Sequence, residues 1–309
     1  MNLQDYQRLN ESFEKTLVFH LGSRAGFFSE YNTMIQAMIY CLRQRIRFEL
    51  YSGDANFKVR RGWPDFFEPF CPEQTCPLHS VFNYRFPRSG IKFALRKHLG
   101  GPVLRTLCQC DYLTYDLWND FRRQPADEAL AIPELNWQGT FRQLCREMVA
   151  LTWRFAPAAA EAVEREGSRL ALPKAYLGVH IRGGDKIKEY HGSPPSAYIE
   201  KLQELSDVRD VLVMTDDYRI FDTLQSDWPD WRFYTLESPA QQGYQHRVNK
   251  RKTTAQKQHD YIRLFAGIER MAAAEYFVGT FTSNIGVFLG MRMHPDRCHG
   301  VDKDDWRMI

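Results

Sequence analysis

The chain has 309 residues, 44 % of them hydrophobic, so it can bury a core, and its length suits two domains. A formal net charge of +3 is too small to indicate a nucleic-acid-binding protein, although small anions remain natural partners. The N-terminus is polar, and no stretch offers the ~18 consecutive apolar residues of a membrane span. We therefore expect a cytoplasmic protein, or a luminal domain separated from a membrane anchor.

The first elements predict the opening of a parallel α/β domain. Residues 16–21 (TLVFHL) form an apolar run typical of a buried strand, and a glycine-containing loop leads from it into a helix beginning near Ser29. Residues 47–51 (RFELY) predict the next strand. The helix should bury one face, because its apolar residues recur every three or four positions: Tyr31, Met34, Ile35, Met38, Ile39 and Leu42. A strand, a helix and a strand in this order are typical of doubly wound folds.

The next part of the chain has no clear periodicity. From Ser52 to about Pro125 it is rich in Pro, Gly and aromatic residues, and WPDFFEPFCP is its densest patch. We expect these aromatic side chains to pack an irregular lobe; stacking on sugar rings or bases is the alternative. From Trp137 to about Glu166 the apolar spacing predicts helix, and the charged stretch at 163–168 marks the boundary between two halves.

The second half alternates strands and helices regularly. Apolar runs and periodic segments predict the following order: strand 175–181, helix 198–205, strand 211–214, helix 220–225, strand 231–236, helix 256–274, strand 275–280 and a helix from Thr282 through Leu289. Repeated β-α units predict a parallel sheet with right-handed crossovers.

Polar residues follow three of these strands at the point where each ends. They are residues 180–186 (HIRGGDK), 215–217 (TDD) and 280–284 (TFTSN). Ligands of open α/β sheets bind beyond the carboxyl ends of the strands, so we expect the three segments to converge on one site. Gly183 and Gly184 permit a tight turn, Arg182 offers a planar fork for a phosphate, and Ser283 opens a helix whose N–H groups suit an anion.

Each of these segments also has an ordinary structural explanation. His180 can simply bond a neighbouring loop, the Asp pair can cap the next helix, and Thr-Ser-Asn is a common N-cap. Their recurrence at three strand ends favours a shared ligand site, and a diphosphate fits the residue types.

Three ordered segments, HIRGGDK with Glu189 after it, VLVMTDD, and HDYIRLFAGIERMAAAEYFVGTFTSNIG, together resemble the motifs of the α1,2/α1,6/protein O-fucosyltransferase superfamily. The α1,6-fucosyltransferases are the most similar branch. The resemblance covers about residues 177–290, and the strand, Gly loop and helix at 16–42 are similar to that family's N-terminal half. It implies an α/β fold of GT-B type, with two Rossmann-like domains facing each other across a cleft. We expect an acceptor-side domain at 1–168, with an irregular insertion at about 52–125, and a GDP-sugar-binding domain at 169–309.

The resemblance also implies an activity and residue roles. The activity is inverting transfer of fucose from GDP-fucose to a glycan hydroxyl, α1,6-linked, with no cofactor and no required metal. Arg182 resembles the motif arginine on the β-phosphate, and Glu189 is compared with the general base, with Asp185 as the alternative. The donor-binding set implied by the likeness is His180, Arg182, Gly183, Lys186, Asp216, Asp217, Asp260, Thr282, Ser283, Asn284 and Gly22.

The sequence departs from the family at two positions. The family often has a second basic residue directly after the motif arginine, where this chain has Gly183, and Lys186 is one residue closer to Glu189 than in the core enzymes. The chemistry of sugar transfer from a nucleotide diphosphate also favours the residue types found in these three segments. Departure of a diphosphate loads charge on the leaving oxygen, so a fixed guanidinium and helix N–H groups lower the barrier. One-step inversion also needs a carboxylate that accepts the acceptor's proton.

Two other kinds of function remain open. A non-catalytic sugar-nucleotide or glycan-binding protein, or a transferase of another GDP-sugar, would keep the phosphate site. A nucleic-acid-binding protein could use the basic run HRVNKRK at 246–252, although that run is short and no stacking motif follows it. We expect a solvated loop, or one that closes over an anionic donor.

Metal chemistry has little support in the sequence. The adjacent carboxylates of Thr-Asp-Asp point different ways from a strand end, and no further ligand set is visible. Seven cysteines without a secretory signal favour reduced thiols. A zinc site is one alternative for five residues, but their spacing matches no standard pattern, so we expect loop and core positions for Cys71, Cys76, His79, Cys108 and Cys110.

Overall fold

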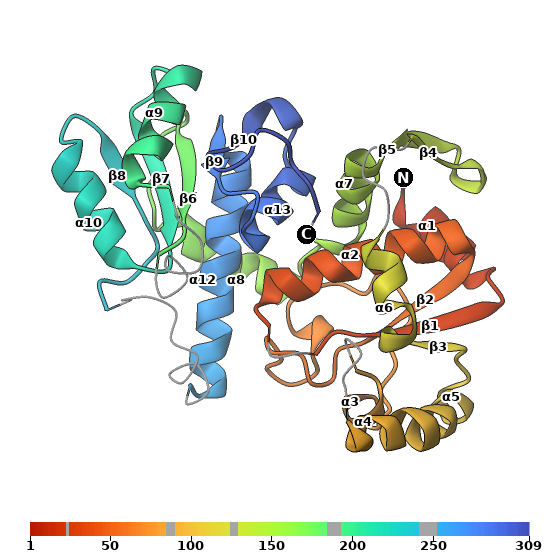
Figure 1. The fold of residues 1–309 in the computed structure, drawn as a ribbon. Helices are drawn as coiled ribbons and strands as arrows, with labels where there is room; N and C mark the ends of the chain where they lie inside the picture. The colour runs from red at the N-terminus through yellow and green to blue at the C-terminus, as the bar shows by residue number, and fades with distance from the viewer. Residues whose placement is uncertain (23–24, 85–89, 124–128, 184–192, 241–251, 309) are drawn as a thin grey trace. The chain divides into compact units, whose positions relative to one another are not determined.

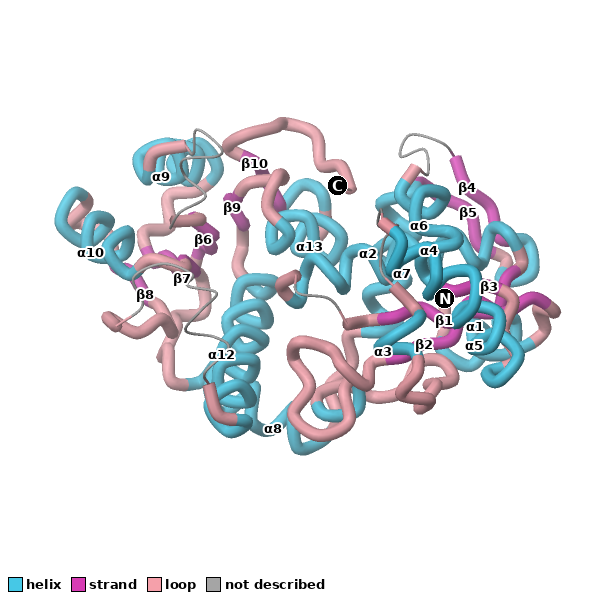
Figure 2. Tube along the Cα trace, turned by 60° about the horizontal axis from the view of Figure 1, so that its bottom comes forward, coloured by secondary structure: helices cyan, strands magenta, loops and turns pink. Residues whose placement is uncertain are grey.

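The computed structural model describes residues 1–22, 25–84, 90–123, 129–183, 193–240 and 252–308 (Figure 1). The chain forms two compact units, Met1–Ala156 and Pro157–Ile309, and each contains its own parallel sheet. In Figure 2 each sheet is covered by helices of its own unit. No helix in these ranges combines the length and the apolar character that crossing a membrane requires.

The first unit has a three-stranded parallel sheet in the order β2-β1-β3. Its strands are β1 (Lys15–His20), β2 (Ile46–Tyr51) and β3 (Tyr112–Leu113). Helix α2 (Phe27–Gln44) connects β1 to β2 and ends at Arg45, whose backbone is left-handed with φ 55°. The apolar face predicted for this helix is confirmed, because all six of its members are buried. Burial of this face explains why the segment is helical, since tertiary packing supplies most helix stability.

The segment from residue 52 to 125 is more regular than we predicted. It contributes β3 to the sheet, and its helices pack on the same core: η1 (Trp63–Asp65), α3 (His79–Phe82), α4 (Ile91–Leu95), the π-helix η2 (Arg96–Gly100), α5 (Gly101–Cys108) and α6 (Thr114–Arg122). The prediction of an irregular insertion is therefore wrong for its second half. These elements are short and Gly-Gly-Pro interrupts them, so periodicity over a long window does not reveal them.

The aromatic patch of this segment is a core. Trp63, Phe66, Phe67 and Phe70 are each at most 1 % exposed, and Trp63 and Phe67 stack with ring centroids 4.4 Å apart. The expectation that these rings pack a lobe is confirmed, and they leave no aromatic platform for a ligand.

The expected helix from Trp137 to Glu166 is three elements. Strand β5 (Trp137–Thr140) pairs with β4 (Ala129–Ile132) as an antiparallel hairpin that encloses η3 (Pro133–Leu135). Helices α7 (Phe141–Thr152) and α8 (Pro157–Ser168) follow. The interruption has a local cause, because Pro157 starts α8 and the residue before a proline disfavours helical backbone. Helix α1 (Leu3–Glu11) completes the first unit.

The division between the units falls before α8, whereas the sequence suggested 168/169. The charged stretch at 163–168 lies within α8, which packs along α12 (Thr254–Ala273) of the second unit. Arg270 on α12 bonds Glu164 and lies 3.4 Å from Ser168 Oγ. Helix α8 therefore belongs with the residues that follow it.

The second unit has a five-stranded parallel sheet in the order β10-β9-β6-β7-β8. Its strands are β6 (Leu177–Ile181), β7 (Asp210–Thr215), β8 (Arg232–Tyr234), β9 (Phe277–Gly279) and β10 (Cys298–Gly300). Its helices after α8 are α9 (Pro195–Leu205), α10 (Tyr218–Asp227), α12 (Thr254–Ala273), α13 (Asn284–Arg292) and η5 (Pro295–Arg297). Every strand and helix predicted here is present, and β10 was not predicted.

The two faces of this sheet are covered by different helices. Leu177, Val179 and Ile181 of β6 pack against α9 and α10, and strand alternation turns Gly178 and His180 to the face covered by α12 (Figure 1). The polar residues after β6 and β7 thus follow strands that are mostly apolar and buried.

Candidate functional site

The carboxyl ends of β9, β6 and β7 lie side by side in the second unit. Val179 pairs with Val278 of β9 on one side and with Val213 of β7 on the other. The sheet order therefore brings the strand ends from which the three polar segments start side by side along one edge. The same edge of a parallel α/β sheet is where ligands bind in this architecture.

The loops after β6 and β7 are joined directly. The backbone N–H of Gly183 donates a hydrogen bond to Oδ1 of Asp216. Arg182 is exposed beside this junction and interacts electrostatically with Asp216. Burial raises the pKa of the Asp216 carboxyl, and the hydrogen bond from Gly183 opposes that shift. The structure thus provides a cation, a bonded backbone amide and a half-buried acid at one point of the edge.

His180 is buried behind this junction. It is 7 % exposed, and its Nδ1 has no hydrogen-bond partner in the described structure. Burial, with the Arg182 charge as a second cause, lowers the pKa of His180 to about 4. The ring is therefore neutral at physiological pH, and one nitrogen keeps a lone pair.

Asp217 has a local structural role. It is the N-cap of α10, where its side chain accepts from the Arg219 N–H at 3.2 Å. The Arg219 guanidinium donates to the same carboxylate, with Nε 2.8 Å from Oδ1, and these bonds lower the pKa of Asp217. Of the two predicted carboxylates, Asp216 faces the β6 loop and Asp217 closes the helix.

The loop after β9 is held by an acid that the sequence analysis missed. Asp302 accepts hydrogen bonds from the N–H of Phe281 at 2.8 Å, the N–H of Thr282 at 3.0 Å and the Thr282 hydroxyl at 2.6 Å. Asp302 follows β10, so the rule that strand ends carry site residues would have identified it once β10 was known.

Ser283 is the N-cap of α13, which is the structural role that the sequence analysis gave as an alternative to ligand binding. Its Oγ accepts from the Gly286 N–H at 3.0 Å and donates to the Thr280 carbonyl at 2.9 Å. Asn284 is the first residue of the helix. The first turn of a nine-residue helix next to Arg182's strand provides backbone N–H groups and a positive dipole end, the features that bind anions.

Asp260 lies on α12, near its start. Its Oδ2 is 2.7 Å from Lys252 Nζ, and both side chains are partly exposed. Helix α12 begins on the side where the strands end and runs back along the sheet (Figure 1). Asp260 is thus on the same side as the predicted site.

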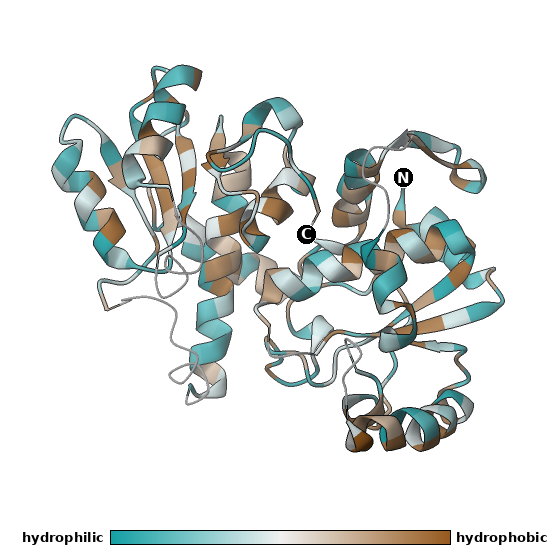
Figure 3. Ribbon diagram, in the orientation of Figure 1, coloured by the Kyte–Doolittle hydropathy of each residue, from teal (hydrophilic) through white to brown (hydrophobic). Residues whose placement is uncertain are grey.

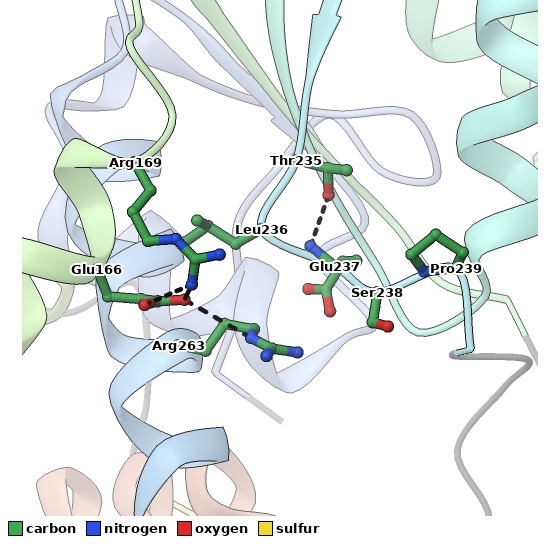
Figure 4. Close-up of a pocket in the computed structure, with 8 residues that line it drawn as sticks. All are labelled: Glu166, Arg169, Thr235, Leu236, Glu237, Ser238, Pro239 and Arg263. Atoms are coloured by element: carbon green, nitrogen blue, oxygen red, sulfur yellow. Dashed lines mark hydrogen bonds and ion pairs between the residues drawn. The ribbon is translucent and has the colours of Figure 1, made fainter.

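A cavity of about 330 Å³ opens at the carboxyl end of β8 (Figure 4). Buried Glu166 lies between two guanidinium groups: Arg169 Nη1 is 2.9 Å from its Oε1, and Arg263 Nε is 3.8 Å from the same atom. The complete lining is Glu166, Arg169, Thr235, Leu236, Glu237, Ser238, Pro239 and Arg263. The sequence does not reveal this cavity, because its central carboxylate, Glu166, lies on α8, a helix that the sequence placed in the other unit.

Gly22 belongs to a different constellation, in the first unit. His20, the last residue of β1, places Nε2 2.5 Å from Asp54 Oδ1, and its Nδ1 contacts the carbonyl of Asn83. His20 is 5 % exposed, whereas the Asp54 side chain is 38 % exposed. A Cβ on Gly22 would collide with Asp54 and lie 2.5 Å from His20 Nε2. Glycine therefore allows the close approach of His20 and Asp54 at this position, and Asp54 is a carboxylate after a strand end that the sequence analysis missed.

Some predicted residues lie outside the described ranges. These are Gly184, Asp185, Lys186, Glu189 and, in the basic run, residues 246–251. Within the described ranges, no three His, Cys, Asp or Glu side chains gather as they would around a metal ion. None of the seven cysteines, all of which lie in the described ranges, forms a disulfide bond, and Cys71 and Cys110 are buried.

The fold has clear relatives among solved structures. No protein-family model and no curated protein matches the chain. NodZ α-1,6-fucosyltransferase soaked with GDP-fucose superposes with a TM-score of 0.53 at 14 % identity, over 91 % of this chain and 93 % of that one. POFUT1 in complex with GDP has a TM-score of 0.50 at 13 % identity, over 92 % and 96 %. A FUT1 variant from Arabidopsis thaliana in complex with GDP has a TM-score of 0.50 at 13 % identity, over 94 % and 72 %.

The chain has the GT-B fold of these fucosyltransferases. The expected α/β class with two Rossmann-like domains is thereby confirmed. Within the GT-B fold, the edge with Arg182, Asp216 and the α13 N-terminus belongs to the C-terminal domain, and the His20–Asp54 pair belongs to the N-terminal domain.

Proposed function

We propose that the protein is an inverting glycosyltransferase that moves fucose from GDP-fucose to a hydroxyl group of an oligosaccharide or glycan, forming an α1,6 linkage. The supporting observation is the edge of the C-terminal sheet, where Arg182 and the Gly183–Asp216 junction neighbour the first turn of α13. The similar GT-B structures carry GDP or GDP-fucose by their own descriptions.

In this proposal the edge binds the diphosphate. Arg182 pairs with the β-phosphate and stabilises the charge that develops as GDP departs. The N–H groups at the start of α13 bind the phosphate from the neighbouring strand, while Thr282, Ser283 and Asn284 shape that turn. Neutral His180 leaves the phosphate's charge to Arg182, because a buried ring with a pKa of about 4 adds no cation.

The nucleoside is assigned to the cavity at the end of β8. Guanine presents N–H donors on one edge and carbonyl and N7 acceptors on another. Glu237 in the cavity wall and Asp260 on α12 are carboxylates able to accept from the first edge, and Arg263 can donate to the second. Asp216 orders the loops between this cavity and the phosphate.

Proton removal from the acceptor is assigned to Glu189, with Asp185 as the alternative and Lys186 as a partner that holds Asp185. Gly22 stays in the proposed donor-binding set because its loop resembles that of the fucosyltransferase family. No metal is proposed, because Arg182 and the helix N-terminus supply the positive charge that a cation would supply.

The test is isothermal titration of GDP, UDP and GDP-fucose in EDTA, with wild type, Arg182→Ala and the matched control Arg165→Ala, an exposed arginine on α8. We expect guanine-selective binding that Arg182→Ala weakens at least about tenfold, as expected for a charge-assisted bond, and that Arg165→Ala preserves. Equal or absent binding of the three ligands would overturn the donor assignment. Binding without GDP release when glycan acceptors are added would favour the non-catalytic alternative, and turnover of another GDP-sugar would replace fucose.

A further inference from the structure

Large hydrophobic side chains are exposed along one helical segment of the N-terminal domain. Among the described residues, the strongly exposed ones all lie between Val81 and Leu107. Five recur at every fourth position along α4, η2 and α5, which we call the apolar stripe: Ile91 (80 % exposed), Leu95 (53 %), Leu99 (66 %), Val103 (55 %) and Leu107 (62 %). Figure 3 shows hydrophobic segments alternating with hydrophilic ones along these helices. A contiguous exposed apolar surface marks an interaction site more often than scattered single residues do.

The stripe is not a core face turned outward, because the opposite face of the segment is already packed. Leu104 is fully buried and Cys108 partly buried in a cluster with Leu113 and Tyr115. Phe93 lies against Tyr84 and Tyr115, with ring centroids 5.3 Å and 6.2 Å apart. One face therefore anchors the segment to the domain and the other presents apolar side chains to the surroundings.

The segment that carries the stripe has charged residues of a single sign. Between Gln74 and Cys110 the sequence has six Lys or Arg and no Asp or Glu. The whole chain carries a formal charge of only +3, so the remainder of the chain is net negative. The positive charge is thus concentrated in the segment that also exposes the apolar side chains.

Two of these cations are held beside the stripe. Arg96 Nη1 donates to Tyr84 Oη at 3.1 Å, and Lys97 Nζ lies 5.8 Å from the Tyr115 ring centroid. Both side chains are exposed. Arg105, in contrast, is paired with Asp116 of α6 at 2.6 Å. Arg96 and Lys97 are therefore available to an anionic partner.

We propose that the apolar stripe and its flanking cations dock the protein on the surface of an anionic lipid bilayer. An interfacial helix inserts apolar side chains at the headgroup boundary while neighbouring Lys and Arg contact anionic headgroups, which is the arrangement seen here. A symmetric pair of copies fits less well. A two-fold interface would bury the stripe, but it would also bring the cations of two copies into one interface, where residues 74–110 supply no acid to pair with them. The surface lies wholly within the N-terminal domain and is independent of the proposed transfer reaction.

The test is co-sedimentation with vesicles of phosphatidylcholine alone and of equimolar phosphatidylcholine and phosphatidylglycerol. We expect wild type to bind the anionic vesicles and to be released by high salt, since the electrostatic part is screened. Leu95→Ser with Leu99→Ser should weaken binding by at least about tenfold, because inserted apolar area drives it, and Leu95→Met with Leu99→Met should preserve it. Arg96→Gln with Lys97→Gln should weaken binding about tenfold.

The control for charge is Arg165→Gln with Lys174→Gln, two exposed cations of the C-terminal domain, which should bind as wild type does. Circular dichroism shows that each variant is folded. Absence of wild-type binding to anionic vesicles, or binding that the serine pair leaves unchanged, overturns the proposal. Concentration-dependent dimerisation that the serine pair abolishes, without vesicle binding, identifies a second copy as the occupant and also overturns it.

Discussion

The backbone amide of Gly183 bonds the side chain of Asp216, and the residues that follow Asp216 leave no room for a side chain at position 183. A Cβ there would lie 2.5 Å from Asp217 Cβ and 3.0 Å from Ile220 Cδ1. Asp217 cannot withdraw, because it caps α10. This packing explains the glycine at a position where the similar family often has a second basic residue.

Gly183→Ala should therefore disturb both stability and the phosphate site. The added methyl group meets a Cβ that has no rotamer to change, so the loop must move, and we expect a loss of about 1–3 kcal/mol in the free energy of unfolding. Urea denaturation measures that loss, and GDP titration should show weaker binding because Arg182 is displaced with the loop. Arg182→Ala, in comparison, should weaken binding with little change in stability. Wild-type stability of Gly183→Ala would contradict the close approach.

Asp216 offers a test that separates hydrogen bonding from charge. Asp216→Asn keeps an oxygen that can accept from the Gly183 N–H, whereas Asp216→Ala leaves that N–H without its partner. We expect the alanine variant to lose about 1 kcal/mol of unfolding free energy, and the asparagine variant to recover most of it. If both variants lose the same amount in urea denaturation, the carboxylate acts through its charge and not through this bond.

The parts of the fold visible in the sequence are those with long apolar runs. Strands β6 and β7 and helix α2 bury most of their residues, so periodicity reveals them. Strands β3 and β10 have two and three residues and carry no comparable signal. Helix α5 begins with Gly101-Pro102 directly after Gly100, and a Gly-Gly-Pro sequence is typical of a loop.

The residues of the candidate site could likewise be predicted from the sequence only in part. Arg182, Asp216 and Ser283 follow recognisable strands, so position alone brings them together. Asp54 contacts His20, 34 positions before it, and Asp302 contacts Thr282, 20 positions before it. Such pairs depend on the final packing. The polar segment Ser52-Gly53-Asp54 nevertheless follows a predicted strand directly, as the polar segments in the second half of the chain do.

Gly22→Ala should disrupt the His20–Asp54 pair. The new Cβ would collide with Asp54 and lie 2.5 Å from His20 Nε2, so the two side chains must separate. We expect a loss of about 1–3 kcal/mol in unfolding free energy, since His20 is buried and loses a partner. Gly26→Ala is the matched control in the same loop, because a Cβ there meets nothing within 4 Å. Equal unfolding free energies for the two variants, measured in urea, would refute the steric argument.

Asp302→Asn should loosen the loop before α13. The carboxylate accepts from three donors, and an amide replaces one of its two oxygens with a donor that faces an N–H. We expect about 1 kcal/mol less unfolding free energy and faster hydrogen exchange at the amides of Phe281 and Thr282. Asp304→Asn, at a nearby exposed position, should exchange as wild type does. Unchanged exchange at both amides in the Asp302 variant would show that the loop is held by other contacts.

His180 should make the protein less stable in mild acid. Its pKa is lowered from 6.5 to about 4 in the folded protein, first by burial and second by the Arg182 charge. Between these two values the unfolded chain binds a proton that the folded chain does not bind. The free energy of unfolding therefore falls as pH decreases from about 6.5 toward 4, by up to about 1.4 kcal/mol per pH unit, and this contribution levels off below about pH 4.

His180→Gln removes this contribution while keeping a polar side chain. The unfolding free energy is measured in urea at about pH 6 and about pH 5. The value for wild type minus the value for the variant should fall by about 1 kcal/mol from the higher pH to the lower. Other groups titrate in both proteins, among them His79, whose pKa burial also lowers to about 4, so the difference isolates His180. His294→Gln is the control, because its side chain is 60 % exposed. A difference that is the same at both pH values would mean that His180 is protonated in the folded protein, and Arg182 would then share the proposed phosphate charge with it.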